Sequence, residues 1–131
     1  MKLTIVKKSR TNNFKDAHVL EKITNLWKNA SASLTTHEGN IYGLYYEYES
    51  NYKGDYSIAV AIEGDNERSI DIPENQEYKV FPVNTEDEQG IFQTWKSIWE
   101  REEKGALQRT YTYDFEKYYP DGQIAIYIAV K

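Results

Sequence analysis

The chain has 131 residues, a length that suits one domain built around a single hydrophobic core. Its formal net charge of −5 argues against a nucleic-acid-binding protein, which needs a clustered basic surface to neutralise phosphates. The absence of cysteine excludes disulfides, thiolate metal sites and cysteine nucleophiles.

The N-terminal part of the chain predicts one strand and one helix. Residues 3–6 favour a strand, and residues 11–13 are of types that end strands and cap helices. From Phe14 onward, apolar residues recur at the spacing of one helical face up to Ala30. We therefore predict a helix that begins near Phe14 and ends within residues 31–33.

Two β-rich segments follow at residues 41–49 and 56–62, with a turn around residues 51–54 between them. Segments of this composition on either side of a turn are typical of a β-hairpin. We therefore predict a hairpin here, followed by a polar linker over residues 63–77.

The second half of the chain predicts the same order of elements. Residues 78–83 favour a strand, and residues 85–88 have the Ser/Thr-x-x-Glu form of a helix capping box. Apolar residues at helical spacing over residues 91–99 predict a helix, which Gly105 is suited to end.

A second hairpin is predicted from residues 107–118 and 123–130. The segment Pro120-Asp121-Gly122 lies between them, and it favours a turn because Pro presets φ and Gly accepts a positive φ.

The order strand, helix, strand, strand therefore occurs twice, over about residues 1–66 and 77–131, and Trp27 has a counterpart in Trp95. One such unit cannot bury its own apolar face, so the two halves are expected to pair around a pseudo-two-fold axis. We predict a single α+β domain over residues 1–131, with an antiparallel sheet, two helices on one face, and a ligand cleft between the halves.

The alternation of side chains in the last strand predicts which face of the sheet is open. Its large aliphatic residues are expected to face the helices, which leaves Tyr127 among alanines on the other face. If Asp121-Gly122 forms a two-residue loop, Glu116 lies opposite Tyr127 on this open face. By the repeat, the equivalent face of the first hairpin should carry Tyr45 and Glu47.

Aromatic residues are expected to line this cleft, because 11 of the 12 tyrosines lie within residues 42–56 and 111–127. A carboxylate such as Glu116 at the floor of an aromatic cleft would be partly desolvated, which raises its pKa unless a cation arrives. Such a site favours cations and accepts flat hydrophobic ligands. The same carboxylate could instead act as a general acid or base.

Simpler interpretations compete with these. Glu116 in an alternating strand would by default be a solvated residue. Trp27, Trp95 and Trp99 lie on helical stripes and are most simply core residues, with only Trp99 a candidate for the cleft. The two histidines lack the spacing of metal ligands, and no cofactor-binding motif is present, so we expect neither a metal nor a cofactor.

Five segments carry a resemblance to a known family. Residues 95–99, 114–118 and 124–130 resemble the effector-binding domain family of gyrase-inhibitor-like proteins, which is also attached to AraC-type and MerR-type transcription regulators. Residues 41–45 and 54–58 are similar to the corresponding first hairpin of that family.

The resemblance implies a duplicated βαββ fold and a central cleft for bulky aromatic, often cationic, compounds. The family's Phe-Glu-x-Tyr motif maps onto Phe115, Glu116 and Tyr118, which implies that Glu116 is the acidic residue of the pocket. Many members carry Pro where this chain has Ala129. Since no helix-turn-helix motif precedes the domain, we do not expect this chain alone to regulate transcription directly.

Three functions remain open at this point. The first is a stand-alone module that captures flat hydrophobic or cationic xenobiotics. The second is a hydrolase that detoxifies cyclopropane-containing DNA alkylators, with Glu116 as its catalytic residue. The third is a protein that interacts with DNA gyrase and protects it. The residues expected to bind the ligand are Tyr45, Glu47, Trp99, Glu116, Tyr118 and Tyr127.

The expected partners are a small aromatic or cationic molecule and, as alternatives, DNA gyrase or a separate regulator. We expect neither direct nucleic-acid binding nor membrane binding. The apolar stretch at the N-terminus is too short for a signal peptide, and no run of residues is long enough to cross a bilayer. We therefore expect a cytoplasmic protein, which agrees with the absence of disulfides.

Overall fold

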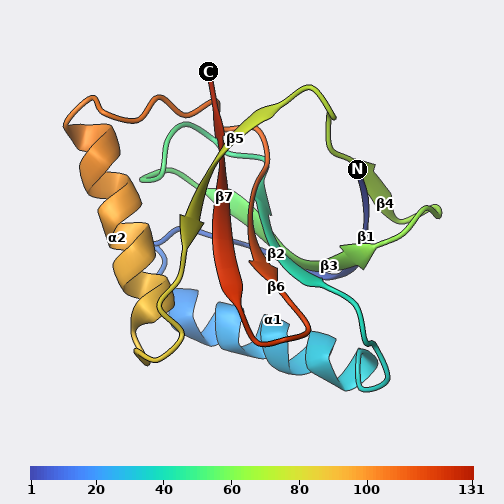
Figure 1. Ribbon diagram of the computed structural model, residues 1–131. Helices are drawn as coiled ribbons and strands as arrows, with labels where there is room; N and C mark the ends of the chain where they lie inside the picture. Colours follow the sequence, from blue (N-terminus) through green and yellow to red (C-terminus); the bar gives the residue numbers. More distant parts are fainter.

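The computed structural model describes all of residues 1–131 as an α+β fold with one seven-stranded sheet and two helices (Figure 1). The elements are, in chain order, β1 (Lys2–Thr11), α1 (Val19–Ser33), β2 (Ile41–Tyr46), β3 (Tyr56–Glu63), β4 (Ser69–Asp71), β5 (Glu77–Pro82), α2 (Gly90–Glu103), β6 (Asp114–Tyr118) and β7 (Ile124–Val130). The strands lie in the order β4-β1-β3-β2-β6-β7-β5, and each neighbouring pair is antiparallel. This confirms the predicted fold class. Neither helix is long and apolar enough to span a membrane.

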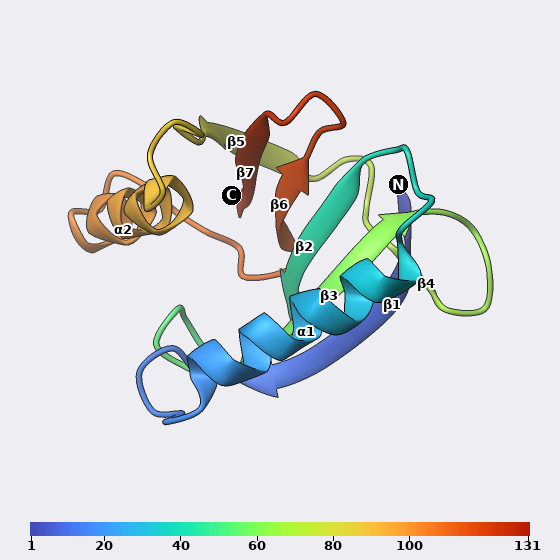
Figure 2. The same cartoon turned by 90° about the horizontal axis from the view of Figure 1, so that it is seen from below.

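The two halves of the sheet meet at its centre. The first half has the order β1-α1-β2-β3 and the second has β5-α2-β6-β7, while the short β4 belongs to the linker and pairs with β1 at the edge. The halves are joined where β2 pairs with β6, which sets Gly43 opposite Glu116. The sheet curls, so that β2 and β6 lie in its middle, with α1 beside one half and α2 beside the other (Figure 2).

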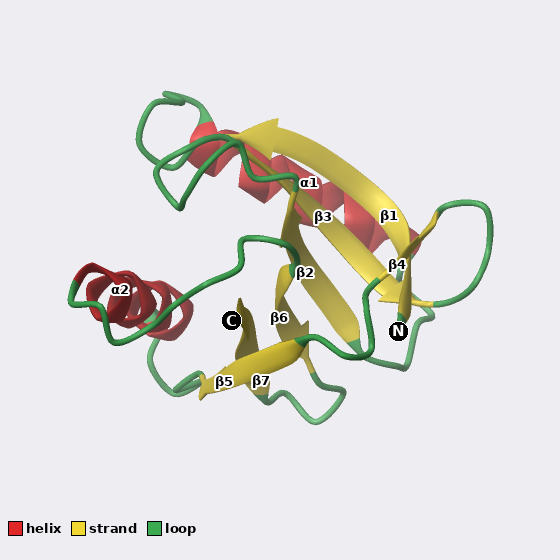
Figure 3. Cartoon of the chain, turned by 90° about the horizontal axis from the view of Figure 1, so that it is seen from above, coloured by secondary structure: helices red, strands yellow, loops and turns green.

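Both helices lie on the same side of the curled sheet but apart from each other (Figure 3). Leu26 of α1 belongs to one buried cluster with Ile58 of β3. Ile98 of α2 belongs to another with Ile126 of β7. The amphipathic stripes predicted from the sequence therefore cover the two ends of the sheet and leave its centre uncovered.

The opposite face of the sheet is filled by side chains. Ala59 and Ala61 belong to the largest buried cluster, together with Tyr42 and Phe115. The ring of Phe115 stacks on that of Tyr127 with centroids 4.8 Å apart. The prediction of an open face beside the alanines was therefore wrong, because the curled sheet brings large aromatic residues over these small ones.

The loop of the second hairpin is longer than predicted. The last pair of the ladder joins Tyr118 to Ile124. Beyond it, the N–H of Tyr119 donates to the carbonyl of Gln123 at 2.9 Å. Gly122 has a φ of 92°, which lies in the left-handed region that glycine adopts without strain.

This longer loop shifts the register of the hairpin by one residue. Phe115 pairs with Tyr127, and Glu116 pairs with Ile126. The predicted pairing of Glu116 with Tyr127 was wrong, since a shift of one residue exchanges the two faces of a strand. Glu116 lies on the face that carries the helices, and Tyr127 lies on the filled face.

Both helices begin later than the predicted capping residues imply. α1 begins at Val19, because the side-chain carbonyl of Asn12 accepts the N–H of Phe14 at 2.8 Å and holds the intervening segment in a turn. α2 begins at Gly90 without a side-chain cap. The predicted capping box does not form, because Thr85 lies in a turn that precedes the helix.

The two central strands are shorter than predicted. β2 ends at Tyr46, and Glu47 beyond it has a φ of 51°. β6 begins only at Asp114, after Tyr111 with a φ of 56°. A positive φ is incompatible with an extended strand, so the backbone turns away from the sheet after β2 and before β6.

Candidate functional site

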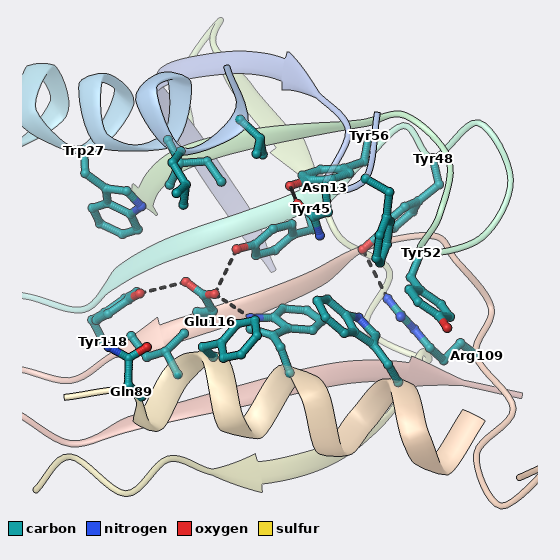
Figure 4. A pocket seen from close by; sticks show the side chains of 18 of the residues that line it. Asn13, Trp27, Tyr45, Tyr48, Tyr52, Tyr56, Gln89, Arg109, Glu116 and Tyr118 are labelled. Carbon is teal, nitrogen blue, oxygen red and sulfur yellow. Dashed lines mark hydrogen bonds between the residues drawn. The ribbon is translucent and has the colours of Figure 1, made fainter. Parts of the chain in front are cut away.

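A cavity of about 820 Å³ lies between the two helices, above the central strands β2 and β6 (Figure 4). Hydrophobic residues make up 14 of its 19 lining residues, and most of them are aromatic. α1 contributes Trp27, α2 contributes Trp95 and Trp99, and the sheet contributes Tyr45 and Glu116. A cavity of this size and lining can enclose a drug-sized flat molecule.

Glu116 is the carboxylate at the floor of the cavity, and only 3% of the residue is exposed. Its Oε2 accepts the hydroxyl of Tyr45 at 2.9 Å and the indole N–H of Trp95 at 2.7 Å. Its Oε1 accepts the hydroxyl of Tyr118 at 2.7 Å (Figure 4). The three donors belong to β2, α2 and β6, so this one carboxylate connects both halves of the sheet with the second helix.

The charge of Glu116 has no cationic partner in the chain. None of the ion pairs includes this residue. Burial raises the pKa of Glu116 above its ordinary value of 4.5, and the three hydrogen bonds oppose that rise. Burial and the nearby carboxylate also raise the pKa of Tyr45 and Tyr118, which keeps both hydroxyls protonated as donors. A cation in the cavity would therefore stabilise the ionised form of Glu116.

Gly43 provides the space that the carboxylate occupies. It faces Glu116 across the β2–β6 ladder, and a Cβ atom at this position would lie 2.9 Å from Oε1 of Glu116 and 3.1 Å from the ring of Trp27. The ring of Trp27 meets that of Tyr118 edge to face, with centroids 5.0 Å apart. Only glycine allows these groups to approach each other above β2.

A buried ion pair lies at the other end of the cavity. Nη2 of Arg109 donates to Oδ2 of Asp114 at 2.7 Å, and the two side chains are 1% and 0% exposed. The hydroxyl of Tyr48 donates to the same oxygen at 2.6 Å, and the N–H of Ala129 donates to Oδ1 at 2.7 Å. The charge of Arg109 is thus matched within the protein, in contrast to that of Glu116.

Aromatic residues also form the rim of the cavity. The rings of Tyr52 and Trp99 stack with centroids 5.4 Å apart, and the ring of Phe14 lies 6.0 Å from that of Trp99. The hydroxyl of Tyr52 donates to Oε1 of Glu103 at 2.6 Å, and Nζ of Lys53 lies 3.6 Å from the same oxygen. The loop between β2 and β3 therefore holds the C-terminal end of α2 beside the cavity.

The cavity brings together four of the six residues predicted to bind the ligand, namely Tyr45, Trp99, Glu116 and Tyr118. Glu47 lies past the end of β2, where it is exposed and accepts the hydroxyl of Ser57 at 2.7 Å. Tyr127 lies on the filled face of the sheet, where its hydroxyl is 2.7 Å from that of Tyr119. Neither residue lines the cavity, because the cleft is on the helix side of the sheet and not on the side predicted.

Several lining residues were missed from the sequence. Trp27 and Trp95 were interpreted as core residues, since a helical stripe shows which side of a helix faces the sheet but not whether the space between them is filled. Their matching positions in the two halves were the signal that could have indicated a shared role. Arg109 lies in an irregular segment after α2, and no spacing or motif in the sequence indicated it.

Comparisons with known proteins agree with a binding site of this kind. Residues 4–130 match the family described as integron-associated effector binding protein, Cass2. A crystal structure of an integron cassette protein from the mobile metagenome of Vibrio cholerae is similar, with a TM-score of 0.73 and 25% sequence identity over 100% of this chain and 90% of that one. No curated protein matches the chain.

These findings support the effector-binding fold that the resemblance in the sequence implied. The matching family is, however, the integron-associated one and not the gyrase-inhibitor-like family named from the sequence motifs.

Proposed function

We propose that the chain, which belongs to the Cass2 family of integron-associated effector binding proteins, captures flat cationic or hydrophobic xenobiotics in the cavity between its helices. The observation that carries this proposal is the buried carboxylate of Glu116, which is held by three neutral donors and has no cation beside it.

The electrostatics of the cavity favour a positively charged ligand. An ionised carboxylate in a site of low dielectric is destabilised by the loss of water, and a cation in the same site offsets that loss. The three donors to Glu116 already occupy both of its oxygens. A ligand that carries a delocalised charge over a flat ring system can therefore interact with the carboxylate without displacing any donor.

The walls of the cavity favour flat ligands over ligands of one fixed hydrogen-bonding pattern. Trp27, Trp95 and Trp99 present large ring surfaces from two sides. A cation over an aromatic ring gains about 0.5–2 kcal/mol, depending on its desolvation. Since ring contacts do not demand a particular set of polar groups, we expect several related compounds to bind.

The proposal can be tested with two ligands of the same three-ring shape, the 10-methylacridinium cation and acridine, which is neutral at pH 7.5. The wild-type protein should bind the cation more tightly, as measured by fluorescence titration. Glu116→Gln should weaken binding of the cation by about tenfold and leave that of acridine nearly unchanged. Glu47→Gln is the matched control, since Glu47 is a carboxylate outside the cavity.

Two outcomes would argue against this account. An unchanged affinity of Glu116→Gln for the cation would remove the carboxylate from ligand recognition. An absence of binding of either compound to the wild-type protein would remove the proposed function itself.

Hydrolysis of a cyclopropane-containing DNA alkylator is a second candidate function. It is favoured by the raised pKa of Glu116, because a carboxyl group of raised pKa is suited to general acid–base catalysis. Mass spectrometry after incubation with such an alkylator distinguishes the two functions. Retention of one equivalent without product supports binding, whereas repeated turnover to the ring-opened hydrate, lost in Glu116→Gln, supports hydrolysis.

The family resemblance in the sequence also implied DNA gyrase or a separate regulator as partner. This stays a prediction, which a pull-down with purified gyrase checks.

A further inference from the structure

Arg109 has more hydrogen-bond donors than the protein satisfies. Only 4% of the residue is exposed, and it lines the cavity (Figure 4). Its Nη2 donates to Asp114 at 2.7 Å and lies 3.4 Å from the hydroxyl of Tyr48. Its Nε and Nη1 are buried and have no hydrogen-bond partner. Buried N–H groups without acceptors are rare and costly, so these donors require an explanation.

The guanidinium is held in place by its surroundings. It lies over the ring of Tyr111, 4.3 Å from the centroid, and the bond to Asp114 fixes one of its edges. A single bridge to Val130, at the end of β7, also holds the backbone of Arg109. A planar donor that is fixed on one edge and buried against a cavity can recognise an acceptor without paying further ordering entropy.

Trp95 contacts both polar ends of the cavity. Its indole N–H donates to Glu116 at 2.7 Å, and the guanidinium carbon of Arg109 lies 6.0 Å from its ring. A flat ligand on the ring of Trp95 therefore has the carboxylate of Glu116 towards one end and the guanidinium of Arg109 towards the other. The two ends favour different ligand groups. Glu116 has no cationic partner, whereas the charge of Arg109 is matched by Asp114.

We propose that Arg109 forms a second subsite, which accepts an uncharged oxygen acceptor, such as an ester, ketone or amide carbonyl, on a ligand whose positive charge lies near Glu116. This inference rests on the proposed function, because it assigns the ligand class of the same cavity. It predicts that the preferred ligands are flat cations that carry a neutral carbonyl group.

The charges around Arg109 exclude an anionic group from this subsite. Asp114 pairs with Nη2, and Oε1 of Glu102 lies 3.8 Å from Nη1. The side chain of Glu102 is 20% exposed and accepts the hydroxyl of Tyr111. These two carboxylates and one guanidinium sum to a negative charge, which repels a ligand carboxylate but not a neutral oxygen.

Rhodamine 123 and rhodamine 110 test this inference, because they share one cationic ring system and differ in a single group. The first carries a methyl ester and the second a free carboxylate. The wild-type protein should bind the ester about tenfold more tightly than the acid, as measured by fluorescence anisotropy.

Two variants change this preference in defined ways. Arg109→Lys keeps a cation beside Asp114 but loses the planar donor edge, and it should reduce the preference for the ester to about twofold or less. Glu102→Gln removes a negative charge at the partly exposed end of α2, and it should strengthen binding of the acid while leaving that of the ester nearly unchanged. Arg68→Lys, which changes an exposed arginine outside the cavity, should keep the wild-type ratio.

The outcomes separate this inference from the function on which it rests. If the wild-type protein binds both dyes equally, and neither Arg109→Lys nor Glu102→Gln alters the ratio, the subsite is overturned while ligand capture stands. If neither dye nor the acridinium cation binds at all, both proposals fail. Should Arg109→Lys not fold, as judged by circular dichroism, the response of Glu102→Gln alone decides, and an unchanged ratio there overturns the subsite.

Discussion

The indole N–H of Trp95 on α2 donates to the buried carboxylate of Glu116 on β6 across 2.7 Å. This bond links the second helix to the centre of the sheet from within the cavity. The position of α2 and the state of Glu116 are therefore physically coupled, and a ligand that alters one affects the other.

Trp95→Phe should lower the free energy of unfolding by more than the smaller size of the Phe ring accounts for. The substitution removes a hydrogen bond to a charged group, and such bonds contribute about 1.5–3 kcal/mol. We expect the free energy of unfolding in urea to fall by about 2 kcal/mol more than in a variant that loses the same ring volume but no hydrogen bond. Trp99→Phe on the same helix is the control, because Trp99 makes ring contacts but donates no hydrogen bond to Glu116. Equal losses in the two variants would contradict the role of the hydrogen bond.

The stability of the protein should fall as pH rises through the raised pKa of Glu116. Burial places this pKa above the ordinary value of 4.5, so between these two values the folded chain binds more protons than the unfolded chain. The free energy of unfolding then decreases with increasing pH over this range. In Glu116→Gln this contribution is absent, so the stability of the variant relative to wild type should increase with pH, which urea titrations between pH 4.5 and pH 8 would measure. A constant difference between the two proteins would show that Glu116 ionises normally.

Cation binding should show the opposite dependence on pH. A cation favours the ionised form of Glu116, so its affinity should increase as pH rises through the raised pKa. Binding should release a proton, which the protein takes up again when the cation dissociates. The permanently charged 10-methylacridinium ion is a suitable probe, since its own charge does not change with pH. Glu116→Gln should bind this probe with an affinity that does not change over this pH range. If the affinity of the variant still changes with pH, another group is responsible for the effect.

Gly43→Ala should weaken ligand binding by displacing the floor of the cavity. The added Cβ would lie 2.9 Å from Oε1 of Glu116 and 3.1 Å from the ring of Trp27, so both side chains must move. Overpacking of this kind costs about 1–3 kcal/mol, and we expect a comparable loss in unfolding free energy together with weaker binding of the acridinium cation. Gly39→Ala is a milder control, because its Cβ would meet only the side chain of His37 at 3.3 Å. A crystal structure of Gly43→Ala with the carboxylate unmoved would contradict the prediction.

Tyr52→Ala should accelerate the release of a bound ligand. The ring of Tyr52 stacks on Trp99 at the rim, and its hydroxyl donates to Glu103, which raises the pKa of Tyr52 to about 12. Without this side chain, the loop between β2 and β3 keeps the ion pair of Lys53 with Glu103 but loses the ring stacking and the hydrogen bond that join it to α2. We expect the ligand to dissociate severalfold faster, as measured by stopped flow. Amide hydrogen exchange in residues 99–103 should also become faster. Tyr52→Phe keeps the ring and should change the rate much less.

The order of the elements could be predicted from the sequence because it depends on local periodicity. The stripes that carry Leu26 and Ile98 follow helical spacing, and both residues pack on the sheet as expected. The aliphatic residues Ile126 and Ile128 were also expected to face the helices, and they do. These features require no knowledge of how distant segments meet.

The location of the cleft could not be predicted, because it depends on the length of one loop and on the curl of the sheet. The turn at Pro120-Asp121-Gly122 was expected, but not the register it imposes, and a shift of one residue separates Glu116 from Tyr127. The small residues that suggested an open face are covered by rings such as that of Phe115, which approach only when the sheet curls. Glu116 nevertheless lines the cavity, and its expected place in the cleft rested also on the resemblance of a motif. Its role as the acidic residue that binds a ligand stays a prediction.

The arrangement around Glu116 has a consequence for the origin of ligand recognition. A polypeptide limited to residues 1–66 would contain Tyr45 and Trp27 but not Glu116. A polypeptide limited to residues 77–131 would contain Glu116 but neither Tyr45 nor Trp27. The cation selectivity that we propose therefore requires both halves, and either half alone should lack it. Mixing the two separated pieces and recovering dye capture would require them to rebuild the ladder between β2 and β6 first.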